Sequence, residues 1–425
     1  MKEFEGKKLL ILGGIRLACD IVKRAQEMGA YVVVADYNMD SPAKQIADEA
    51  VLINAMDVDA IVDYCRSAHI DGVTTGFVDI LLQPCYEVCK RLGLPCYLTP
   101  KMIEVSTNKA AFKEACQQYG VPIPQTYLIG GTISEEVYAK LQYPVFVKPL
   151  DSSGSRGAGV CQNREELDAR FTEALSYSAS GNAIIEDYLS GREFLMNFIA
   201  QDGEFRMISM FDRYTTSSRS SAINYANLSM GPSMAVDYYL SDVNDKVVKM
   251  FRSMGFKDGL YFLQGFSDGD KISFYEMGCR LGGSYYDLED DIIDIDPIKM
   301  TVRYALSGKM TDRINEIPVD VGRYDKIGVC VNYLLDGEGT IHSISGIEEI
   351  KRFPSFVAID EVHAVGYHYQ IDRTVDKPVV SVYLAVDSLE QLATDVNYMN
   401  SIIHVVDSTG KSLLKEPFNP DLLLQ

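Results

Sequence analysis

A single lysine stands at the end of a short apolar strand, shortly before a loop of small residues. Residues 143–149 read Tyr-Pro-Val-Phe-Val-Lys-Pro, and residues 151–159 read Asp-Ser-Ser-Gly-Ser-Arg-Gly-Ala-Gly. Small side chains allow backbone N–H groups to close around phosphate oxygens, while hydroxyl and guanidinium groups add further donors. A flexible surface loop beside a solvated Lys148 is the alternative interpretation. The loop also lacks the Gly-Lys-Ser/Thr ending of a Walker A motif.

Two further segments could contact a nucleotide and a metal ion. Residues 183–193 read as a strand, a turn and a second strand that carries Glu193. Such a turn can offer backbone groups to a purine, and a carboxylate beyond it can accept both ribose hydroxyls. Residues 274–283 place Glu276 at a strand end, with Arg280 and a Gly-Gly pair after it, which suits a Mg²⁺–phosphate centre. A plain hairpin and a cross-strand Glu–Arg ion pair are the structural alternatives.

The order and spacing of these segments are specific when they are taken together. They resemble the ATP-grasp superfamily in sequence order: Lys109, Lys148, the small-residue loop, Glu186 to Glu193, and Glu276 with Arg280. The first hundred residues, with Asp36-Tyr37-Asn38 at a strand end, resemble the domain before the ATP-grasp core in biotin carboxylase, carbamoyl phosphate synthetase and glycinamide ribonucleotide synthetase. The run from Gly337 to Gly346 resembles the cap region of the biotin carboxylase and L-amino acid ligase branches. The resemblance covers nearly the whole chain.

The resemblance implies ATP and Mg²⁺ as cofactors and a role for each matching residue. Two lysines and the loop would bind the phosphates: Lys109, Lys148, Ser152, Ser153, Ser155, Arg156 and Gly157. The adenine hinge, the ribose carboxylate and a further nucleotide contact would come from Glu186, Tyr188, Glu193 and Phe266. Glu276 matches the acid that binds Mg²⁺. Arg280 matches the arginine that stabilises a carboxylate or acyl-phosphate oxygen, and it would form the catalytic pair with Lys148.

Two positions depart from the family's usual metal site. Gln264 stands where a first metal-binding acid is usual, and Gly278 stands where Asn is usual. The chain keeps Glu276 from the usual acid–acid–Asn set, and Mg²⁺ prefers charged oxygen ligands. We expect Gln264 to serve as a neutral metal ligand beside Glu276, with water filling the space left by Gly278.

The elements that position these residues follow from periodicity. The first hundred residues alternate short apolar strands with helices, which predicts a parallel sheet covered by helices. A linker is expected near Thr99-Pro100, and Asn108 offers a cap for a helix from Lys109 to Tyr119. A hairpin is expected around residues 259–277. Residues 214–230 lack periodicity and are expected to form an irregular loop, mobile or facing the substrate.

We therefore expect three parts. An α/β pre-ATP-grasp domain with a parallel sheet would occupy residues 1–108. An α+β ATP-grasp core would follow at 109–310, with a lid subdomain at about 125–190. A strand-rich C-terminal part at 311–425 would complete the core.

Composition narrows the classes of partner. The formal net charge is -20, and an acidic surface repels phosphate backbones, so nucleic acid is not expected as a partner. No apolar stretch is long enough for a membrane span and the N-terminus lacks a signal peptide core, so we expect no membrane partner and a cytoplasmic location. The nine scattered cysteines are expected to be reduced thiols rather than a metal site. Relatives of this kind often form homodimers.

Three functions from different classes remain in view. The first is a Mg²⁺-dependent ligase in which ATP activates a small carboxylate as an acyl phosphate for attack by an amine or a similar nucleophile. The second is an ATP-binding protein without ligase turnover, which the substitutions at Gln264 and Gly278 would favour. The third is an NAD-dependent oxidoreductase, suggested by Gly13-Gly14 and Asp36 but disfavoured because G-x-G-x-x-G is absent.

Overall fold

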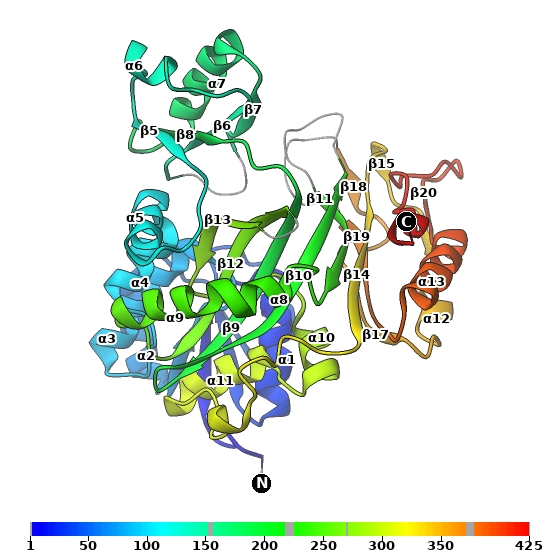
Figure 1. The fold of residues 1–425 in the computed structure, drawn as a ribbon. Coiled ribbons are helices and arrows are strands. Elements are labelled where there is room, and N and C mark those ends of the chain that lie inside the picture. The colour runs from blue at the N-terminus through cyan, green and yellow to red at the C-terminus, as the bar shows by residue number, and fades with distance from the viewer. Residues whose placement is uncertain (1, 152–155, 217–224, 269–270, 371–377, 425) are drawn as a thin grey trace.

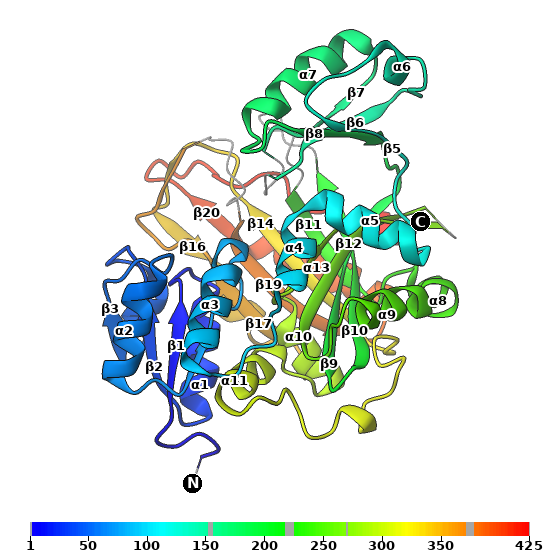
Figure 2. The same cartoon turned by 90° about the vertical axis from the view of Figure 1, so that its left-hand side faces the viewer.

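The computed structural model describes residues 2–151, 156–216, 225–268, 271–370 and 378–424. Its first part is a four-stranded parallel sheet in the order β3-β2-β1-β4. The strands are β1 (Lys8–Leu12), β2 (Tyr31–Ala35), β3 (Glu49–Val51) and β4 (Gly72–Thr74). The helices that accompany them are α1 (Ala18–Glu27), α2 (Val58–Ala68) and α3 (Leu82–Leu92). The predicted α/β alternation is confirmed (Figures 1 and 2).

Residues 100–119 form two helices where a linker had been expected at the first of them. They are α4 (Pro100–Thr107) and α5 (Lys109–Tyr119). The Thr99 side chain caps α4 and a proline follows it, a helix start that the linker prediction overlooked. The Asn108 side chain caps α5 by accepting hydrogen bonds from two backbone N–H groups, as predicted.

Residues 126–187 form a small unit that stands above the rest of the molecule, and we call it the lid (Figure 1). Its antiparallel sheet has the order β5-β8-β6-β7. Its elements are β5 (Thr126–Gly130), α6 (Glu135–Tyr138), β6 (Val145–Pro149), β7 (Gly159–Cys161), α7 (Arg164–Ser176) and β8 (Ala183–Asp187). Buried side chains of α7 and of this sheet form a core that belongs to the lid alone.

An eight-stranded antiparallel sheet forms the centre of the molecule, in the order β13-β12-β9-β10-β11-β14-β19-β17. Its strands are β9 (Arg192–Gln201), β10 (Glu204–Thr216), β11 (Tyr225–Gly231), β12 (Gly259–Asp268), β13 (Lys271–Gly278), β14 (Ile327–Leu334), β17 (Phe356–Glu361) and β19 (Pro378–Val386). The predicted β12–β13 hairpin is confirmed. The C-terminal strands extend the same sheet, so the strand-rich C-terminal part is continuous with the core (Figure 1).

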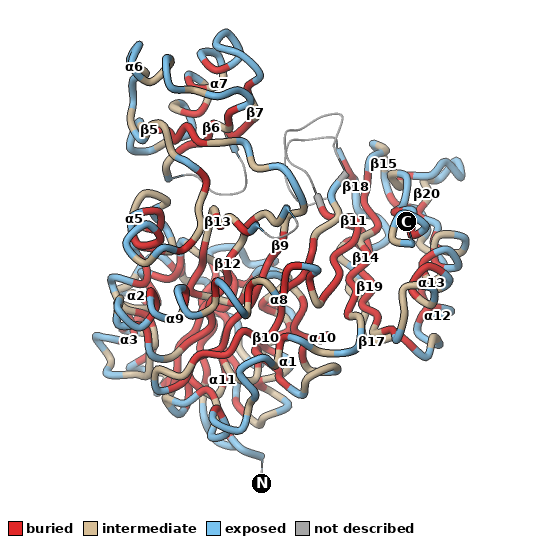
Figure 3. Tube along the Cα trace, viewed as in Figure 1, coloured by how far each residue is buried: buried red, intermediate tan, exposed pale blue. Residues whose placement is uncertain are grey.

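Both faces of this central sheet are covered, so its strands are largely buried (Figure 3). Aromatic rings such as those of Phe198, Phe251 and Phe274 pack on the face that carries α5, α8 (Val236–Tyr238) and α9 (Asn244–Ser253). The other face meets α10 (Tyr286–Ile293) and α11 (Pro297–Ser307), beyond which the N-terminal sheet lies. Because both faces are covered, the site residues have to lie at the end of the sheet that is below the lid.

The C-terminal strands carry their own helical layer. It consists of α12 (Ile347–Ile350) and α13 (Leu389–Ile402), with the short strand pairs β15 (Gly339–Thr340)–β18 (His368–Tyr369) and β16 (Ser343–Ser345)–β20 (His404–Val406). Their apolar side chains form a separate buried cluster with β14 and β19.

The prediction of an irregular loop at residues 214–230 is wrong at both ends of this segment, where the structure describes the chain. Strand β10 continues to Thr216 and β11 begins at Tyr225, while residues 217–224 lie outside the described residues. Leu228 and Met230 are buried in the C-terminal cluster, and Ser229 between them faces the other side. This alternation with a period of two was present in the sequence and was masked by its polar composition.

Candidate active site

The β12–β13 hairpin places the two predicted metal ligands opposite each other. Gln264 pairs with Glu276, and the register then shifts so that Tyr275 is left over as a bulge. Phe266 pairs with Ser273 beyond the bulge. Because directly opposed residues of an antiparallel pair share a face, the side chains of Gln264, Phe266 and Glu276 lie on one face of the sheet.

Glu276 and Gln264 are both half-buried, and neither side chain makes a hydrogen bond or an ion pair with a residue that the structure describes. A partly buried carboxylate is stabilised by a nearby positive charge, so Glu276 is suited to bind a cation. No group of three or more His, Cys, Asp or Glu side chains within the described ranges could hold a metal ion by itself. The two oxygen donors fit a Mg²⁺ ion whose remaining ligands are phosphate oxygens and water.

Gly278 is required by the ring of Phe262, its partner across the hairpin. A Cβ on residue 278 would lie 2.0 Å from Phe262 Cε1, and a Cβ on Gly282 would lie 2.4 Å from Phe262 Cβ. The guanidinium group of Arg280 lies over the same ring, 4.7 Å from its centroid. The expectation that water fills the space left by Gly278 is wrong, because the phenyl ring fills it.

Lys109, at the start of α5, lies close to groups from three other segments. Burial lowers its pKa, while the nearby carboxylates of Glu276, Asp151 and Glu186 act in the opposite direction and Lys148 in the same one. The structure therefore brings together Lys109, Lys148 and Glu276, which the sequence separates widely. The two lysines provide positive charge beside the carboxylate of Glu276, an arrangement that suits a triphosphate.

The carboxylate of Glu186, a residue that we expect in the adenine hinge, lies between two lysines. Its Oε1 is 2.6 Å from Lys148 Nζ, and its Oε2 is 2.6 Å from Lys113 Nζ. All three side chains are buried. Sequence reasoning missed Lys113, although its spacing of four residues from Lys109 puts both lysines on one side of a helix and could have identified it.

Tyr188 and Phe266 line one cavity of about 370 Å³ between the end of the lid sheet and the tip of the β12–β13 hairpin. Leu189 and Ser190, which follow β8, line it as well. Glu186 is not among the described residues that line it. The cavity has the position and the aromatic walls that an adenine ring requires.

Glu193 follows this turn on β9 and pairs with Phe266 in the sheet. Its Oε1 accepts a hydrogen bond from the Tyr275 hydroxyl at 2.5 Å and lies 3.0 Å from Arg213 Nη1. The carboxylate expected to bind ribose is thus oriented by two partners on one oxygen. Its Oε2 keeps acceptor capacity for a hydroxyl group.

Arg280 is held by a carboxylate of the N-terminal part. Its Nε and Nη2 each lie 2.7 Å from an oxygen of Asp79, and its Nη1 donates to the Leu281 carbonyl at 2.7 Å. A guanidinium has five N–H donors, so two remain for a bound molecule. Asp79 follows β4 at the carboxyl edge of the parallel sheet, where α/β proteins commonly bind ligands.

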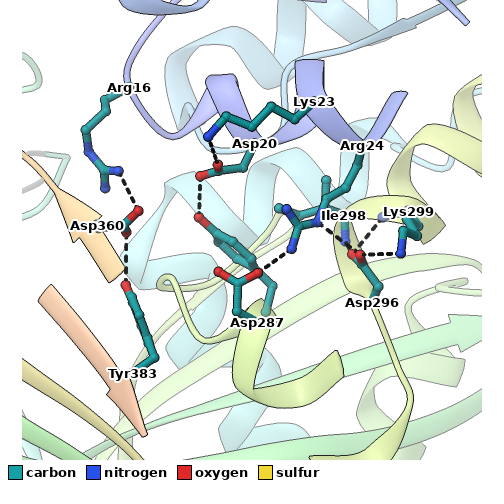
Figure 4. Close-up of polar contacts among 11 residues, drawn as sticks. Arg16, Asp20, Lys23, Arg24, Asp287, Asp296, Ile298, Lys299, Asp360 and Tyr383 are labelled. Carbon is teal, nitrogen blue, oxygen red and sulfur yellow. Dashed lines mark hydrogen bonds and ion pairs between the residues drawn. The ribbon is translucent and has the colours of Figure 1, made fainter. Parts of the chain in front are cut away.

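A network of polar contacts fastens the N-terminal part to the central sheet (Figure 4). Arg16 lies 3.1 Å from Asp360, which also accepts a hydrogen bond from Tyr383. On α1, Arg24 contacts Asp287 and Asp296. Burial would lower the pKa of Arg24, and the two carboxylates reverse this and raise it. The network holds the helix α1 against α10, α11 and the strand β17.

The loop before β7 is described from Arg156 onward. Arg156 is exposed, and Gly157 adopts a left-handed conformation with φ 71°, which only glycine takes readily. Ser152, Ser153 and Ser155 lie outside the described residues. Lys148, on the neighbouring strand β6, lies 5.6 Å from the ring centroid of Tyr275 and so points from the lid toward β13.

Two family models match the chain. The model described as D-ala D-ala ligase C-terminus matches residues 118–254, and the model described as ribonucleotide synthetase preATP-grasp domain matches residues 6–107. Both matched stretches carry residues of the site, Lys148 in the first and Asp79 in the second.

Individual proteins are similar over most of the chain. The 2-oxoglutarate carboxylase small subunit of Hydrogenobacter thermophilus is 23% identical over 88% of this chain and 82% of its own length. The solved structure of L-amino acid ligase from Bacillus licheniformis has a TM-score of 0.76 at 19% identity, covering 95% of this chain and 99% of that one. The biotin carboxylase domain dimer of the Hydrogenobacter thermophilus enzyme, solved with MgADP, ADP and bicarbonate, has a TM-score of 0.76 at 18% identity, covering 94% and 90%.

None of the helices in the described ranges combines the length and the apolar character that crossing a membrane needs.

Proposed function

Because the chain belongs to the ATP-grasp superfamily, we propose that it is an ATP-dependent ligase that activates a small carboxylate as an acyl phosphate. An amine or a similar nucleophile then takes the acyl group. The observation that carries this proposal is the meeting of Lys109, Lys148 and Glu276, from a helix, the lid and the central sheet, at one place below the lid.

The nucleotide would lie between the lid and the sheet. Its adenine ring would occupy the cavity of Tyr188 and Phe266, and Glu193 Oε2 would accept the ribose hydroxyls. Its phosphates would reach Lys109, Lys148 and the loop that carries Arg156. Glu276 and Gln264 would hold a Mg²⁺ ion, whose chemistry is to neutralise charge on the phosphate oxygens.

The reaction needs no covalent bond to the protein. A carboxylate oxygen of the substrate attacks the γ-phosphorus, the bond from that phosphorus to the bridging oxygen breaks, and ADP leaves. The nucleophile then attacks the acyl carbon, the carbon–oxygen bond to phosphate breaks, and the nucleophile releases a proton as inorganic phosphate departs. The protein positions the reactants and stabilises charge, with the two unengaged N–H groups of Arg280 directed at the reacting carboxylate.

The assembly and the cellular site form part of the same proposal. The Hydrogenobacter thermophilus biotin carboxylase domain, to which the fold is similar, was solved as a dimer, and we place this chain in a homodimer as well. We also place it in the cytoplasm, where ATP and small metabolites are available. Its ligands would be a small carboxylate and a nucleophile, without nucleic acid or membrane.

A second candidate function is ATP binding without ligase turnover. The ring of Phe262 occupies the space where the superfamily usually has a metal-binding Asn, and Glu276 remains as the carboxylate of that site. Fewer charged ligands would hold the metal less tightly, which favours binding over catalysis.

The test is ADP and phosphate release with Mg²⁺-ATP and a panel of small carboxylates and amines. Ligase function predicts that release depends on one carboxylate and rises with one nucleophile, and that Glu276→Gln abolishes it while the protein stays folded. Release that is absent with every acid, beside tight ATP binding, would favour the second candidate. Absence of ATP binding would refute both.

A further inference from the structure

Lys113 and Glu186 form a buried ionic unit with Lys148, and neither of them touches the nucleotide cavity. The two lysines come from different elements, α5 and β6, and Glu186 comes from β8. Relative exposure of the whole residues is 2% for Lys113, 3% for Glu186 and 6% for Lys148. Each ammonium group lies 2.6 Å from its own oxygen of the carboxylate.

We propose that Lys113 is a positioning residue for the ATP phosphates. It shares the Glu186 carboxylate with Lys148, so that the three side chains together keep a net positive charge. The inference rests on the proposed ATP site and adds to it a residue that makes no contact with ATP. Its basis is the charge of the buried unit and the elements that the unit connects.

The charge of the unit decides how strongly Lys148 attracts phosphate. Two ammonium groups and one carboxylate carry a net charge of +1, whereas Lys148 and Glu186 alone would be neutral. Burial alone would raise the pKa of Glu186, and the ammonium groups of Lys148 and Lys113 hold that pKa below its usual value. The carboxylate is therefore ionised, and without Lys113 it would cancel the charge of Lys148. Electrostatic effects of this kind are strong where water is excluded.

The contacts of Lys113 within the described residues centre on Glu186. Its Nζ and Glu186 Oε2 lie at ion-pair distance, yet neither atom has an aligned hydrogen-bonding partner among the described residues. Burying an ammonium group with so little compensation is unfavourable for stability. The charge that Lys113 supplies therefore explains its buried position better than packing does.

The same contact links the lid to the sheet that carries Glu276. Helix α5 lies outside the lid and packs against α9 and β13, whereas Glu186 and Lys148 belong to the lid sheet. Through Glu186, Lys113 therefore helps to hold Lys148 in its position near β13, where Lys148 faces Tyr275. Charge and position act on the phosphate lysine together.

The experiment compares four full-length proteins by calorimetric titration with Mg²⁺-ATP, Mg²⁺-ADP and adenosine: the parent, Lys113→Met, Lys113→Met with Glu186→Gln, and Lys113→Arg. We expect Lys113→Met to weaken ATP binding by about tenfold and to leave adenosine binding within twofold, since the loss is confined to the phosphates. The double variant removes one charge of each sign and leaves Lys148 as the cation. It should recover ATP affinity to within about threefold of the parent. Lys113→Arg should retain most of it.

Lys101→Met is the matched control, because Lys101 pairs with Glu104 on the surface and lies outside the site. It should bind ATP like the parent. Melting temperatures of all variants separate folding from binding. A purely structural role for Lys113 predicts that the double variant binds ATP no better than Lys113→Met, and that result would overturn the inference. Unchanged ATP affinity in Lys113→Met would overturn it as well. If the parent does not bind ATP, the proposed function itself fails and the inference with it.

Discussion

The phenyl ring of Phe262 lies where a side chain on residue 278 would begin, because Phe262 and Gly278 are partners across the β12–β13 hairpin. The ring also supports the guanidinium of Arg280. Residue 278 therefore has no room for a side chain, because the aromatic residue two positions before Gln264 fills that space. The glycine and the phenylalanine form one structural unit.

This unit predicts a coupled effect on stability. Gly278→Asn should destabilise the protein by about 1–3 kcal/mol or more, because the new side chain overlaps the ring. Phe262→Ala should cost about 3–5 kcal/mol through the cavity it leaves. The double variant should lose less than the sum by at least about 1 kcal/mol, since each change relieves the other. Urea unfolding of all four proteins measures the coupling.

Gly130→Asn is the matched control for this prediction. A Cβ on residue 130 would lie 3.6 Å from Leu128 Cδ1, which is ordinary van der Waals contact. Gly130→Asn should reduce the free energy of unfolding much less than Gly278→Asn does, and it should show no coupling to Phe262→Ala. Strict additivity of Gly278→Asn and Phe262→Ala would contradict the pairing.

Lys148 should govern the phosphate end of the nucleotide. Lys148→Ala removes a charge-assisted contact and should weaken Mg²⁺-ATP binding about ten- to a hundredfold, which corresponds to roughly 1.5–3 kcal/mol. Adenosine binding should change little, because the cavity of Tyr188 and Phe266 remains. Lys140→Ala, an exposed lysine of the lid, serves as the control. Equal loss for ATP and adenosine would show that the whole lid has been disturbed.

Arg280 should act in turnover more than in ATP binding. Arg280→Lys keeps the positive charge but cannot make the two parallel bonds to Asp79 while pointing donors at a substrate. We expect a fall in kcat of at least about a hundredfold with ATP affinity within about threefold. Arg91→Lys changes an exposed arginine paired with Asp59 and should leave both quantities unchanged. A parallel loss of ATP affinity would move Arg280 into the nucleotide site.

Glu289 should make stability depend on pH. Its pKa is raised to about 7, chiefly by burial and also by the charges of Asp296 and Asp287, which together outweigh the lowering effect of the hydrogen bonds from Ser209 and Asn197. The folded protein holds this proton more tightly than the unfolded chain, so the stabilisation is complete below about pH 4.5 and is lost as pH rises through about 7. Its size is roughly 3 kcal/mol. Once Glu289 has lost this proton, its buried negative charge is destabilising.

The variant that tests this is Glu289→Gln, which keeps Oε1 as the acceptor for Asn197 and Ser209. Its free energy of unfolding should fall less steeply between pH 5 and pH 8 than that of the parent, so that the variant gains relative stability at the alkaline end. Urea unfolding at several pH values provides the measurement. Identical pH profiles in the two proteins would mean that Glu289 has an ordinary pKa.

Much of the fold could be predicted because its signals are local. The Asn108 cap, the span of α5 and the β12–β13 hairpin depend on residues a few positions apart, and the structure confirms them. The Thr99 cap of α4 and the alternation in β11 are equally local signals, although we expected a linker at the first and an irregular loop at the second. The order of the motifs was sufficient to recognise the superfamily.

The sequence by itself determined the motif order, the cations near the small-residue loop and the presence of Gln264 and Gly278 at two positions of the expected metal site. Only the tertiary structure decided which groups meet: Asp79 with Arg280, 201 residues apart, and Lys113 with Glu186. It also decided that Phe262 closes the space beside Gly278. The physical reason is that caps and periodicity arise from neighbouring residues. Contacts between distant side chains depend instead on strand register, a bulge and the packing of separate segments, which no single stretch of sequence encodes.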